Sequence, residues 1–289
     1  MAYRPYSITR RGALTALGGL AFQGHAIGAT KFLRIGALGA LPPRETDELP
    51  LSDQSNIGKW RTLPSFSDEF NGETLDHTKW SPTDSWNGMK PSFFSPENVS
   101  VEAGCLNITC QLREPPAALA NEGYGKWSTG IVKSVTPVLY GYFEVRAKPM
   151  RAAALSSFWF YEKYDHEQIE VDVFEMCKNR NDAVNNYQMT LHVYQLPGLK
   201  EDKASEARWI SPFDLADDFH VFGFNWTPSQ LEFFVDGVLV HRADNTSWHS
   251  PMHMVLDSEV HEHGCGLPAP SSLPSVYKVD YVRSWQQLP

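Results

Sequence analysis

Three acidic residues lie close together in the segment 168–176, which reads Gln-Ile-Glu-Val-Asp-Val-Phe-Glu-Met. Glu170 and Asp172 alternate with apolar residues, and this period of two is typical of a β-strand whose successive side chains point to opposite faces. Glu170 and Asp172 would therefore share one face. Strict alternation would send Glu175 to the other face, so we predict a β-bulge over residues 173–174 that returns it to the acidic side.

Three carboxylates on one face suit the cleavage of a glycosidic bond. Acids in a row on a largely dehydrated face raise each other's pKa, a cost that a purely structural strand has no reason to bear. A retaining glycosidase needs an ionised nucleophile and a protonated acid about 5 to 5.5 Å apart. The Cα atoms of Glu170 and Glu175 would be about 13 Å apart along a strand, so their side chains must lean together or the bulge must tighten. Asp172, between them, can hold the nucleophile in place and raise the pKa of the neighbouring acid.

A calcium site or a solvated strand face would also give a group of acids. A calcium loop needs closely spaced oxygen ligands around a glycine, whereas Val171, Val173 and Phe174 are strand formers and no glycine follows. Clustered acids with shifted pKa values are more typical of an active site than of a solvated face. We therefore favour catalysis.

The elements that must position these acids are β-strands, since short β-rich segments recur between turn residues and no long segment has helical periodicity. Twelve strands are predicted, at residues 98–101, 106–112, 128–134, 141–147, 156–161, 169–176, 187–195, 219–226, 231–235, 238–242, 252–258 and 277–285. Asp236-Gly237 separates two of them and is a strong hairpin signal. Even strand spacing without intervening helices predicts an all-β jelly-roll sandwich of two antiparallel sheets.

Composition and charge narrow the class of protein. The 289 residues are 42% hydrophobic and 20% charged, which predicts a folded globular chain. The formal net charge of −9 argues against a nucleic-acid-binding protein, which concentrates Lys and Arg to neutralise phosphates. A sulfated substrate would have to be held by a few local cations, because the overall field does not attract anions.

The N-terminal region predicts export. Arg10-Arg11 precede an apolar run of small residues, and we interpret residues 1–29 as a signal peptide of the twin-arginine type. A membrane anchor is less favoured, because the run is short for a bilayer span and is interrupted by Thr15, Gln23 and His25. We predict a secreted or periplasmic protein whose mature chain has no integral membrane segment.

A linker and one domain are predicted beyond the export signal. Residues 30–58 are rich in Pro, Asp, Ser and Glu toward their end and read as a linker, and residues 59–289 read as the catalytic domain. Four cysteines are too few for a disulfide framework. An exported chain could still form one or two disulfides. Cys105 and Cys110 would be about 16 Å apart in a strand, too far to pair with each other, and the pairing among Cys105, Cys110, Cys177 and Cys265 otherwise stays open.

Around the acids, a series of motifs resembles glycoside hydrolase family 16, in the bulged branch whose active strand reads Glu-x-Asp-x-x-Glu. That branch contains laminarinases, β-agarases, porphyranases and κ-carrageenases. The resemblance covers nearly all of residues 60–287. The matching motifs, in chain order, are Ser67-Asp68-Glu69-Phe70-Asn71-Gly72 with Trp80, Glu97-Asn98-Val99-Ser100-Val101, Gly141-Tyr142-Phe143-Glu144-Val145-Arg146-Ala147, Phe158-Trp159-Phe160, His220-Val221-Phe222-Gly223-Phe224-Asn225-Trp226, Phe234-Val235-Asp236-Gly237 and Val279-Asp280-Tyr281-Val282-Arg283.

The resemblance implies roles for the three acids: Glu170 as nucleophile, Asp172 as its helper and Glu175 as general acid/base. It implies a jelly roll of two curved sheets whose concave face is an open substrate cleft, and therefore endo-acting attack on a long polysaccharide. No cofactor is implied for catalysis. Many members bind a structural calcium on the convex side, where Glu69 and Asp280 look similar to ligand positions.

Within the family, several segments look more like the algal-galactan enzymes than the laminarinases. These segments are Trp86-Asn87-Gly88, Glu97-Asn98-Val99, Gly123-Tyr124-Gly125 and His192-Val193-Tyr194. In that branch a histidine at His192 would contact the sugar on the leaving-group side, although a hydrogen-bonded structural histidine accounts for the residue equally well. Residues 261–265 carry His and Cys where the galactan enzymes often have an aromatic residue, and this departure leaves the identity of the sugar open.

Sugar-binding candidates outside the acids are aromatic or cationic. Trp and Tyr bind the apolar C–H faces of sugars, so Trp86, Trp127, Trp159 and Trp209 are candidate platforms, with Trp127 placed in a loop. Arg151, like Lys178, Arg180 and Arg208, could pair with a sulfate group, although a lone surface cation is usually just solvated.

The sequence thus predicts an exported, monomeric, retaining endo-glycoside hydrolase. Its expected substrate is a β-linked red-algal galactan, agar or porphyran before κ-carrageenan. A β-1,3-glucanase is the alternative enzyme, a lectin-like sugar-binding protein is the alternative without catalysis, and the balance between hydrolysis and transglycosylation stays open.

Overall fold

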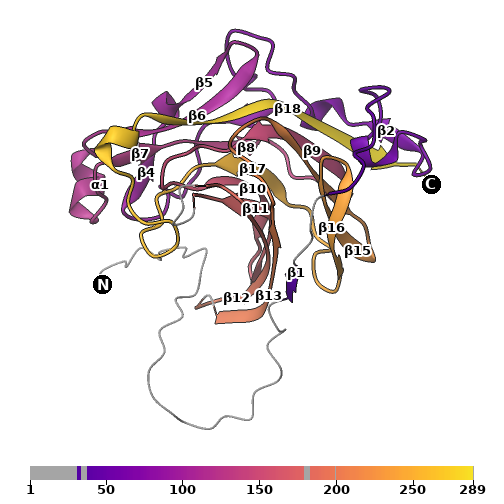
Figure 1. The fold of residues 1–289 in the computed structure, drawn as a ribbon. Coiled ribbons are helices and arrows are strands. Elements are labelled where there is room, and N and C mark those ends of the chain that lie inside the picture. The colour runs from indigo at the N-terminus through magenta and orange to yellow at the C-terminus, as the bar shows by residue number, and fades with distance from the viewer. Residues whose placement is uncertain (1–30, 34–37, 179–182, 199, 289) are drawn as a thin grey trace.

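The computed structural model describes residues 31–33, 38–178, 183–198 and 200–288. The predicted export signal, residues 1–29, lies outside these residues. Figure 1 shows two curved layers of strands stacked on each other, with β8, β17, β10 and β11 in the inner layer and β6 and β18 above them. No helix among the described residues is long and apolar enough to cross a membrane.

The elements of the described residues are mostly short strands. The strands are β1 (Lys31–Leu33), β2 (Trp60–Thr62), β3 (Trp80–Ser81), β4 (Ser92–Phe94), β5 (Val99–Glu102), β6 (Cys105–Leu112), β7 (Trp127–Thr129), β8 (Ile131–Ser134), β9 (Gly141–Lys148), β10 (Ser156–Lys163), β11 (Glu167–Met176), β12 (Asn186–Gln195), β13 (Lys200–Ile210), β14 (His220–Trp226), β15 (Gln230–Val235), β16 (Val238–Asp244), β17 (His253–Asp257) and β18 (Ser275–Gln287). The helices are α1 (Ala117–Asn121) and the 3-10 turns η1 (Leu51–Asp53), η2 (Pro64–Phe66), η3 (Pro96–Asn98) and η4 (Pro270–Ser272).

These strands form two sheets within the described residues. The inner sheet has the order β1-β13-β12-β11-β10-β17-β8-β3, and the outer sheet has the order β16-β15-β14-β9-β18-β6-β7-β4, with β2 and β5 paired to β18 and β6. The pairs are antiparallel apart from β1 with β13 and β4 with β7. The all-β sandwich expected from the sequence is confirmed, and β11, which carries the three acids, lies inside the inner sheet.

The core lies between the sheets and is rich in aromatic rings. Phe158 and Phe160 of β10 are buried and point toward the outer sheet. The ring of Phe160 is 4.9 Å from that of Phe143 on β9 and 5.5 Å from that of Phe224 on β14, measured between centroids. Burying such rings is the main source of stability for a sandwich of this kind, and it leaves the opposite face of the inner sheet available for polar groups.

The hairpin prediction is confirmed at residues 236–237. Val235 of β15 pairs with Val238 of β16, and Asp236 and Gly237 both have positive φ, at 48° and 78°. Two positive φ angles in a two-residue loop are the mark of a type I′ turn, whose twist matches that of the flanking strands.

The predicted strands differ from the structure in two respects, and the short strands β1 to β4 were not predicted either. The single strand expected over residues 128–134 is divided at Gly130 into β7, which joins the outer sheet, and β8, which joins the inner one. The chain crosses between the layers there because Gly130 has no side chain. β13 was missed, because its sequence Lys-Glu-Asp-Lys-Ala-Ser-Glu-Ala-Arg-Trp-Ile is too polar to show strand periodicity.

The second part of the predicted linker packs on the domain. Arg44 Nη2 lies 2.7 Å from Oε2 of Glu144, a β9 residue whose side chain is fully buried. The backbone N–H of Leu51 donates to the other oxygen of Glu144, and the indole N–H of Trp285 donates to the carbonyl of Glu48 at 2.6 Å. Residues 44–51 therefore satisfy a buried carboxylate of the outer sheet, which a solvated linker would not do.

Gly130 offers a test of the crossing between the sheets. A Cβ atom there would lie 2.9 Å from Cγ2 of Val99 and 3.2 Å from the carbonyl oxygen of Asn98. Gly130→Ala should therefore lower the free energy of unfolding by about 1–3 kcal/mol through overpacking. The control is Gly72→Ala, where the nearest atom would lie at an ordinary 3.5 Å and the change should stay within about 0.5 kcal/mol. Equal effects in denaturant titrations would contradict the role given to Gly130 at the crossing.

Candidate active site

The three acids share one face of β11 because the strand is bulged. On β12, Asp172 pairs with Thr190 and Glu175 with Gln188, so two residues of β11 face one residue of β12. The pairing of β11 with β10 shifts at the same place. Val173 and Phe174 are both fully buried in the core between the sheets, where their packing stabilises the bulge. The bulge predicted from the sequence is confirmed, and it brings Glu175 back to the face of Glu170 and Asp172.

The acids are buried in the protein yet lie on the face turned away from the aromatic core. Glu170 is 0%, Asp172 1% and Glu175 4% exposed. An oxygen of Glu170, an oxygen of Asp172 and a ring nitrogen of His192 all lie within 4.8 Å of one another. Ionised carboxylates this close repel each other, and burial disfavours charge, so the site favours holding at least one proton. Such a set can combine a charged group with a protonated one.

His192 joins this set from the neighbouring strand β12, where it lies directly opposite Glu170. Its Nε2 is 3.6 Å from Oδ2 of Asp172, and its Nδ1 is 2.6 Å from Oε1 of Glu201 on β13. Its ring stacks on that of Tyr194, with centroids 5.4 Å apart. The ring is thus fixed on three sides beside the acids. The contact with a sugar that the resemblance implies for His192 stays a prediction.

Tyr194 lies among four carboxylates. Burial raises the pKa of its hydroxyl, and the negative charges of Glu170, Glu201, Asp172 and Glu175 raise it further. Because the hydroxyl keeps its proton across the ordinary pH range, Tyr194 remains a hydrogen-bond donor beside the acids. The sequence assigned no role to Tyr194 or Glu201, and Glu201 was missed because β13 was not recognised as a strand.

Trp159 of β10 lies on the same face as the acids, directly opposite Asp172 of β11. Its indole N–H donates to Oδ1 of Asp257 on β17 at 3.1 Å, which fixes the plane of the ring. It packs with Ile131 and Val255 in an apolar cluster of its own, against which Trp86, Phe94 and Tyr161 also pack. The cluster gives the acidic face an apolar neighbour. Trp159 itself is only 3% exposed, and the role of sugar platform for Trp159 and Trp86 stays a prediction.

The strand that carries the acids is anchored at both ends of the site. At one end, the indole N–H of Trp248, a buried residue, donates to the backbone carbonyl of Glu170 at 2.9 Å. At the other end, Cys177 follows β11 directly and forms a disulfide with Cys265, with the Cα atoms 5.9 Å apart. Cys105 and Cys110 are free thiols, so the prediction that they do not pair is confirmed.

Two of the predicted tryptophan platforms need correction. Trp209 is fully buried in the core between the sheets, where it packs against Tyr187. Strand alternation explains this, since its neighbour Arg208 takes the face of the acids and pairs with Glu206. Trp127 begins β7 rather than lying in a loop, and it packs partly against the same core.

Two of the predicted cationic residues, Arg151 and Arg208, form ion pairs with acids. Arg151 is exposed, and its guanidinium forms ion pairs with Asp214, at 2.8 Å, and with Asp217. Arg180 lies outside the described residues. A sulfate group at Arg151 would therefore have to compete with two carboxylates.

The two residues suggested for calcium also face guanidiniums. Glu69 binds Arg283 through both carboxylate oxygens, at 2.7 and 2.9 Å, and Oδ2 of Asp280 is 2.7 Å from Nη1 of Arg146. Calcium prefers oxygen ligands and would have to displace both guanidiniums, so the two side chains as placed do not fit that ion.

Comparison with known proteins adds to this geometry. A family model described as the glycoside hydrolase family 16 domain of β-porphyranases A to D matches residues 60–287. β-Porphyranase E of Zobellia galactanivorans is 29% identical in an alignment of 258 residues that covers 80% of this chain and 89% of that protein. The extracellular agarase of Streptomyces coelicolor is 26% identical in an alignment of 242 residues that covers 70% of this chain and 74% of that protein.

Solved structures agree with the fold. The complex of the κ-carrageenase of Pseudoalteromonas carrageenovora with an oligotetrasaccharide of κ-carrageenan superposes with a TM-score of 0.66 at 26% identity, covering 79% of this chain and 96% of that chain. Porphyranase B of Zobellia galactanivorans superposes with a TM-score of 0.68 at 24% identity, covering 78% of this chain and 92% of that chain. At this level of identity, the second likeness concerns the fold alone.

The cysteine chemistry of the site region can be tested directly. Peptide mapping without reductant should recover Cys177 linked to Cys265. Burial raises the pKa of the Cys110 thiol to about 12, so at pH 8 almost none of it is the reactive thiolate and iodoacetamide should not label it in the folded protein. Unfolding in denaturant should make both free thiols reactive. Rapid labelling of Cys110 before unfolding would contradict its burial.

Proposed function

Because this chain belongs to glycoside hydrolase family 16, we propose that it cleaves a β-linked red-algal galactan from within the chain and with net retention, acting on agar or porphyran ahead of κ-carrageenan. The observation that carries this proposal is the bulge of β11, which collects Glu170, Asp172 and Glu175 on one buried face. Retaining cleavage needs two carboxyl groups of opposite protonation state close together, and three buried carboxyl groups on one face support such a pair.

In the proposed reaction, Glu175 and Glu170 act from the two ends of the row. Glu175 donates its proton to the glycosidic oxygen as the bond to the anomeric carbon breaks. The carboxylate of Glu170 attacks that carbon and forms a covalent glycosyl-enzyme. Glu175 then takes a proton from water, whose oxygen attacks the anomeric carbon and releases Glu170. The sugar is thus inverted twice and retains its configuration.

The remaining side chains hold the acids and the substrate. Asp172 lies between the two glutamates, and its negative charge supports a proton on a neighbouring acid. His192 is held by Glu201 and faces Asp172, and these contacts support a role for it in binding a sugar beside the cleavage point. Trp159, fixed by Asp257, is only 3% exposed, so we expect the partly exposed Trp86 that packs against its cluster to offer the larger ring surface to the C–H face of a sugar.

Galactan specificity rests on the relatives. β-Porphyranases, a κ-carrageenase and an agarase are among the proteins to which this chain is similar, and names of enzymes on red-algal galactans recur among them. We place agar first because the arginines near the site, Arg151 and Arg208, are already paired with acids, whereas a sulfated galactan would need cations that are free to bind it. Porphyran, which is also sulfated, comes ahead of κ-carrageenan because the matching family model is that of β-porphyranases.

Export to an oxidising compartment fits the disulfide between Cys177 and Cys265, because structural disulfides persist there. The Arg10-Arg11 pair would direct the chain out of the cytoplasm by the twin-arginine route. We propose that the enzyme acts outside the cytoplasm as a monomer.

The catalytic assignment predicts a large loss of activity in two variants. Glu170→Gln and Glu175→Gln keep the size of the side chain and remove its acid–base chemistry, so hydrolysis should fall roughly 100-fold or more in each. Initial rates of reducing-end release measure this effect. Glu167→Gln is the matched control, since Glu167 begins the same strand at its partly exposed end. Unchanged rates in both outer variants would leave a sugar-binding protein without catalysis as the better interpretation.

The substrate assignment predicts an order of activities. The protein should release reducing ends from agarose or porphyran faster than from κ-carrageenan, and more slowly or not at all from laminarin. Equal amounts of each polysaccharide should be compared under one set of conditions. Activity on laminarin alone would instead identify a β-1,3-glucanase.

A further inference from the structure

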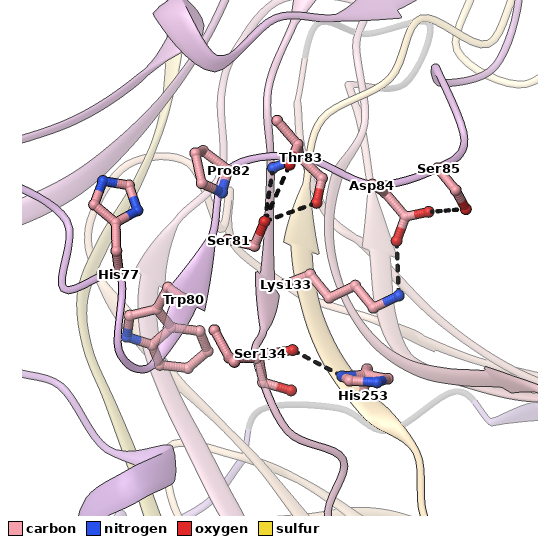
Figure 2. A pocket seen from close by; sticks show the side chains of 11 residues that line it. His77, Trp80, Ser81, Pro82, Thr83, Asp84, Ser85, Lys133, Ser134 and His253 are labelled. Carbon is pink, nitrogen blue, oxygen red and sulfur yellow. Dashed lines mark hydrogen bonds and ion pairs between the residues drawn. The ribbon is translucent and has the colours of Figure 1, made fainter.

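A polar pocket lies near the far edge of the inner sheet, on strands β8 and β3. It is lined by residues 81–85 together with Lys133, Ser134 and His253, among others, and Trp80 forms part of its wall. Figure 2 shows Lys133 and Asp84 reaching toward each other across it, with His253 beside Ser134. None of these residues belongs to the acidic row on β11.

The pocket and the acids share one face of the sheet. Across neighbouring strands, Asp172 pairs with Trp159, Trp159 with Val255, Val255 with Lys133, and Lys133 with Ser81. Residues directly opposite each other in a sheet point to the same face, so these five form a row across the strands. At ~4.8 Å per strand, Lys133 is roughly 14 Å and Ser81 roughly 19 Å from Asp172 along the sheet. That distance is several sugar residues of a polysaccharide.

The surface between the two sites suits a sugar chain. Trp159, Ile131 and Val255 form an apolar cluster there that is itself only 1–3% exposed, so the apolar surface open to a sugar is that of Trp86 and Tyr161, which pack against the cluster and stay partly exposed. The ammonium group of Lys133, which lines the pocket, lies 5.5 Å from the centroid of the Tyr161 ring. The exposed aromatic surface therefore borders the pocket. Sugar rings bind such surfaces through their C–H faces and use polar groups at the ends for hydroxyls.

The charges in the pocket are balanced. Nζ of Lys133 lies 2.8 Å from Oδ2 of Asp84, and the two side chains are only 20% and 5% exposed. Burial works to raise the pKa of Asp84, but the hydrogen bonds from Lys133 and from the Trp86 backbone N–H lower it overall, so the carboxylate stays ionised beside the ammonium. His253 faces Glu162, with Nε2 and Oε2 3.3 Å apart. The pocket therefore offers donors and acceptors without a surplus of positive charge.

We propose that this pocket is a distal subsite that binds an uncharged sugar residue of the polysaccharide, several residues away from the bond that is cleaved. The inference rests on the proposed function, because it requires a long sugar chain along this face. An ammonium–carboxylate pair can donate to one hydroxyl and accept from another, which matches an unsulfated sugar. A sulfate ester would meet the carboxylate of Asp84 beside the ammonium and would be repelled by it.

The test removes both charges of the pair together, so that neither is left buried alone. Asp84→Asn and Lys133→Met are combined in a protein that also carries Glu170→Gln, which prevents cleavage of the probe. Calorimetry then measures the Kd of unsulfated agarose oligosaccharides, from the disaccharide to the dodecasaccharide. The control carries Glu232→Gln and Arg242→Met, which remove an ion pair from the outer sheet.

We expect affinity in the Glu170→Gln parent and in the control to rise with length until the chain reaches the pocket. The pocket variant should bind short oligosaccharides as tightly as the parent and long ones roughly tenfold more weakly, since one or two hydrogen bonds are lost. Thr83→Trp, at an exposed position on the rim of the pocket, should weaken the binding of long oligosaccharides in the same way while leaving the Asp84–Lys133 ion pair intact.

Three results would overturn the inference. The first is that the pocket variant and Thr83→Trp both remain folded and their affinity still rises with oligosaccharide length as it does in the parent. The pocket is then not a subsite, while the proposed function stands. The second is that removing the Asp84–Lys133 pair costs sulfated porphyran oligosaccharides more affinity than unsulfated ones of equal length. The pocket then does not select an uncharged sugar. If no oligosaccharide of any length binds the parent, the subsite and the proposed galactan substrate both fail.

Discussion

The site depends on one extra residue in strand β11. A strand with regular alternation would place Glu175 in the core and leave a hydrophobic side chain on the acidic face. The bulge sends Val173 and Phe174 into the core together, where both are fully buried, and returns Glu175 to the side of Glu170 and Asp172. The packing of two apolar side chains between the sheets therefore stabilises a row of three acids on the other face. Hydrophobic burial on one side of the strand holds the electrostatically costly arrangement on the other side.

The surroundings of the strand serve the same arrangement. β11 lies inside the inner sheet, so both of its edges are paired, and its neighbours supply Trp159 from β10 and His192 from β12. Each of these two side chains is held in turn by a carboxylate, Asp257 for the indole and Glu201 for the imidazole. Groups fixed in this way need little reorganisation when a substrate binds, which is the usual requirement of a site that stabilises charge.

Much of the fold could be predicted from local patterns in the sequence. The acidic alternation in 168–176, the bulge and the turn at 236–237 each follow from a few neighbouring residues, and the structure confirms them. β13 could not be found in this way, because its polar sequence forms a strand only through pairing with β12. Trp209 was misplaced for the same reason, since its face is decided by the register of that pairing.

Contacts between segments that are distant in the sequence could not be predicted from local patterns either. The partnership of Cys177 with Cys265, 88 residues apart, and the binding of Arg44 to Glu144, 100 residues apart, depend on how the sheets stack. The same holds for Asp84 and Lys133, which meet because β3 and β8 are neighbours in the inner sheet. Sequence patterns describe one strand at a time, whereas such pairs are properties of the assembled sandwich.

We propose that the bulged strand presents Glu170 as the group that bonds to the sugar. A galactan oligosaccharide with fluorine at the 2-position of the reacting sugar and a good leaving group slows the second step and lets the glycosyl-enzyme accumulate. Digestion and mass spectrometry would then locate the added sugar. We expect the peptide containing residues 168–176 to carry it, with the bond at Glu170. Attachment at Glu175, or at a residue outside β11, would contradict the claim.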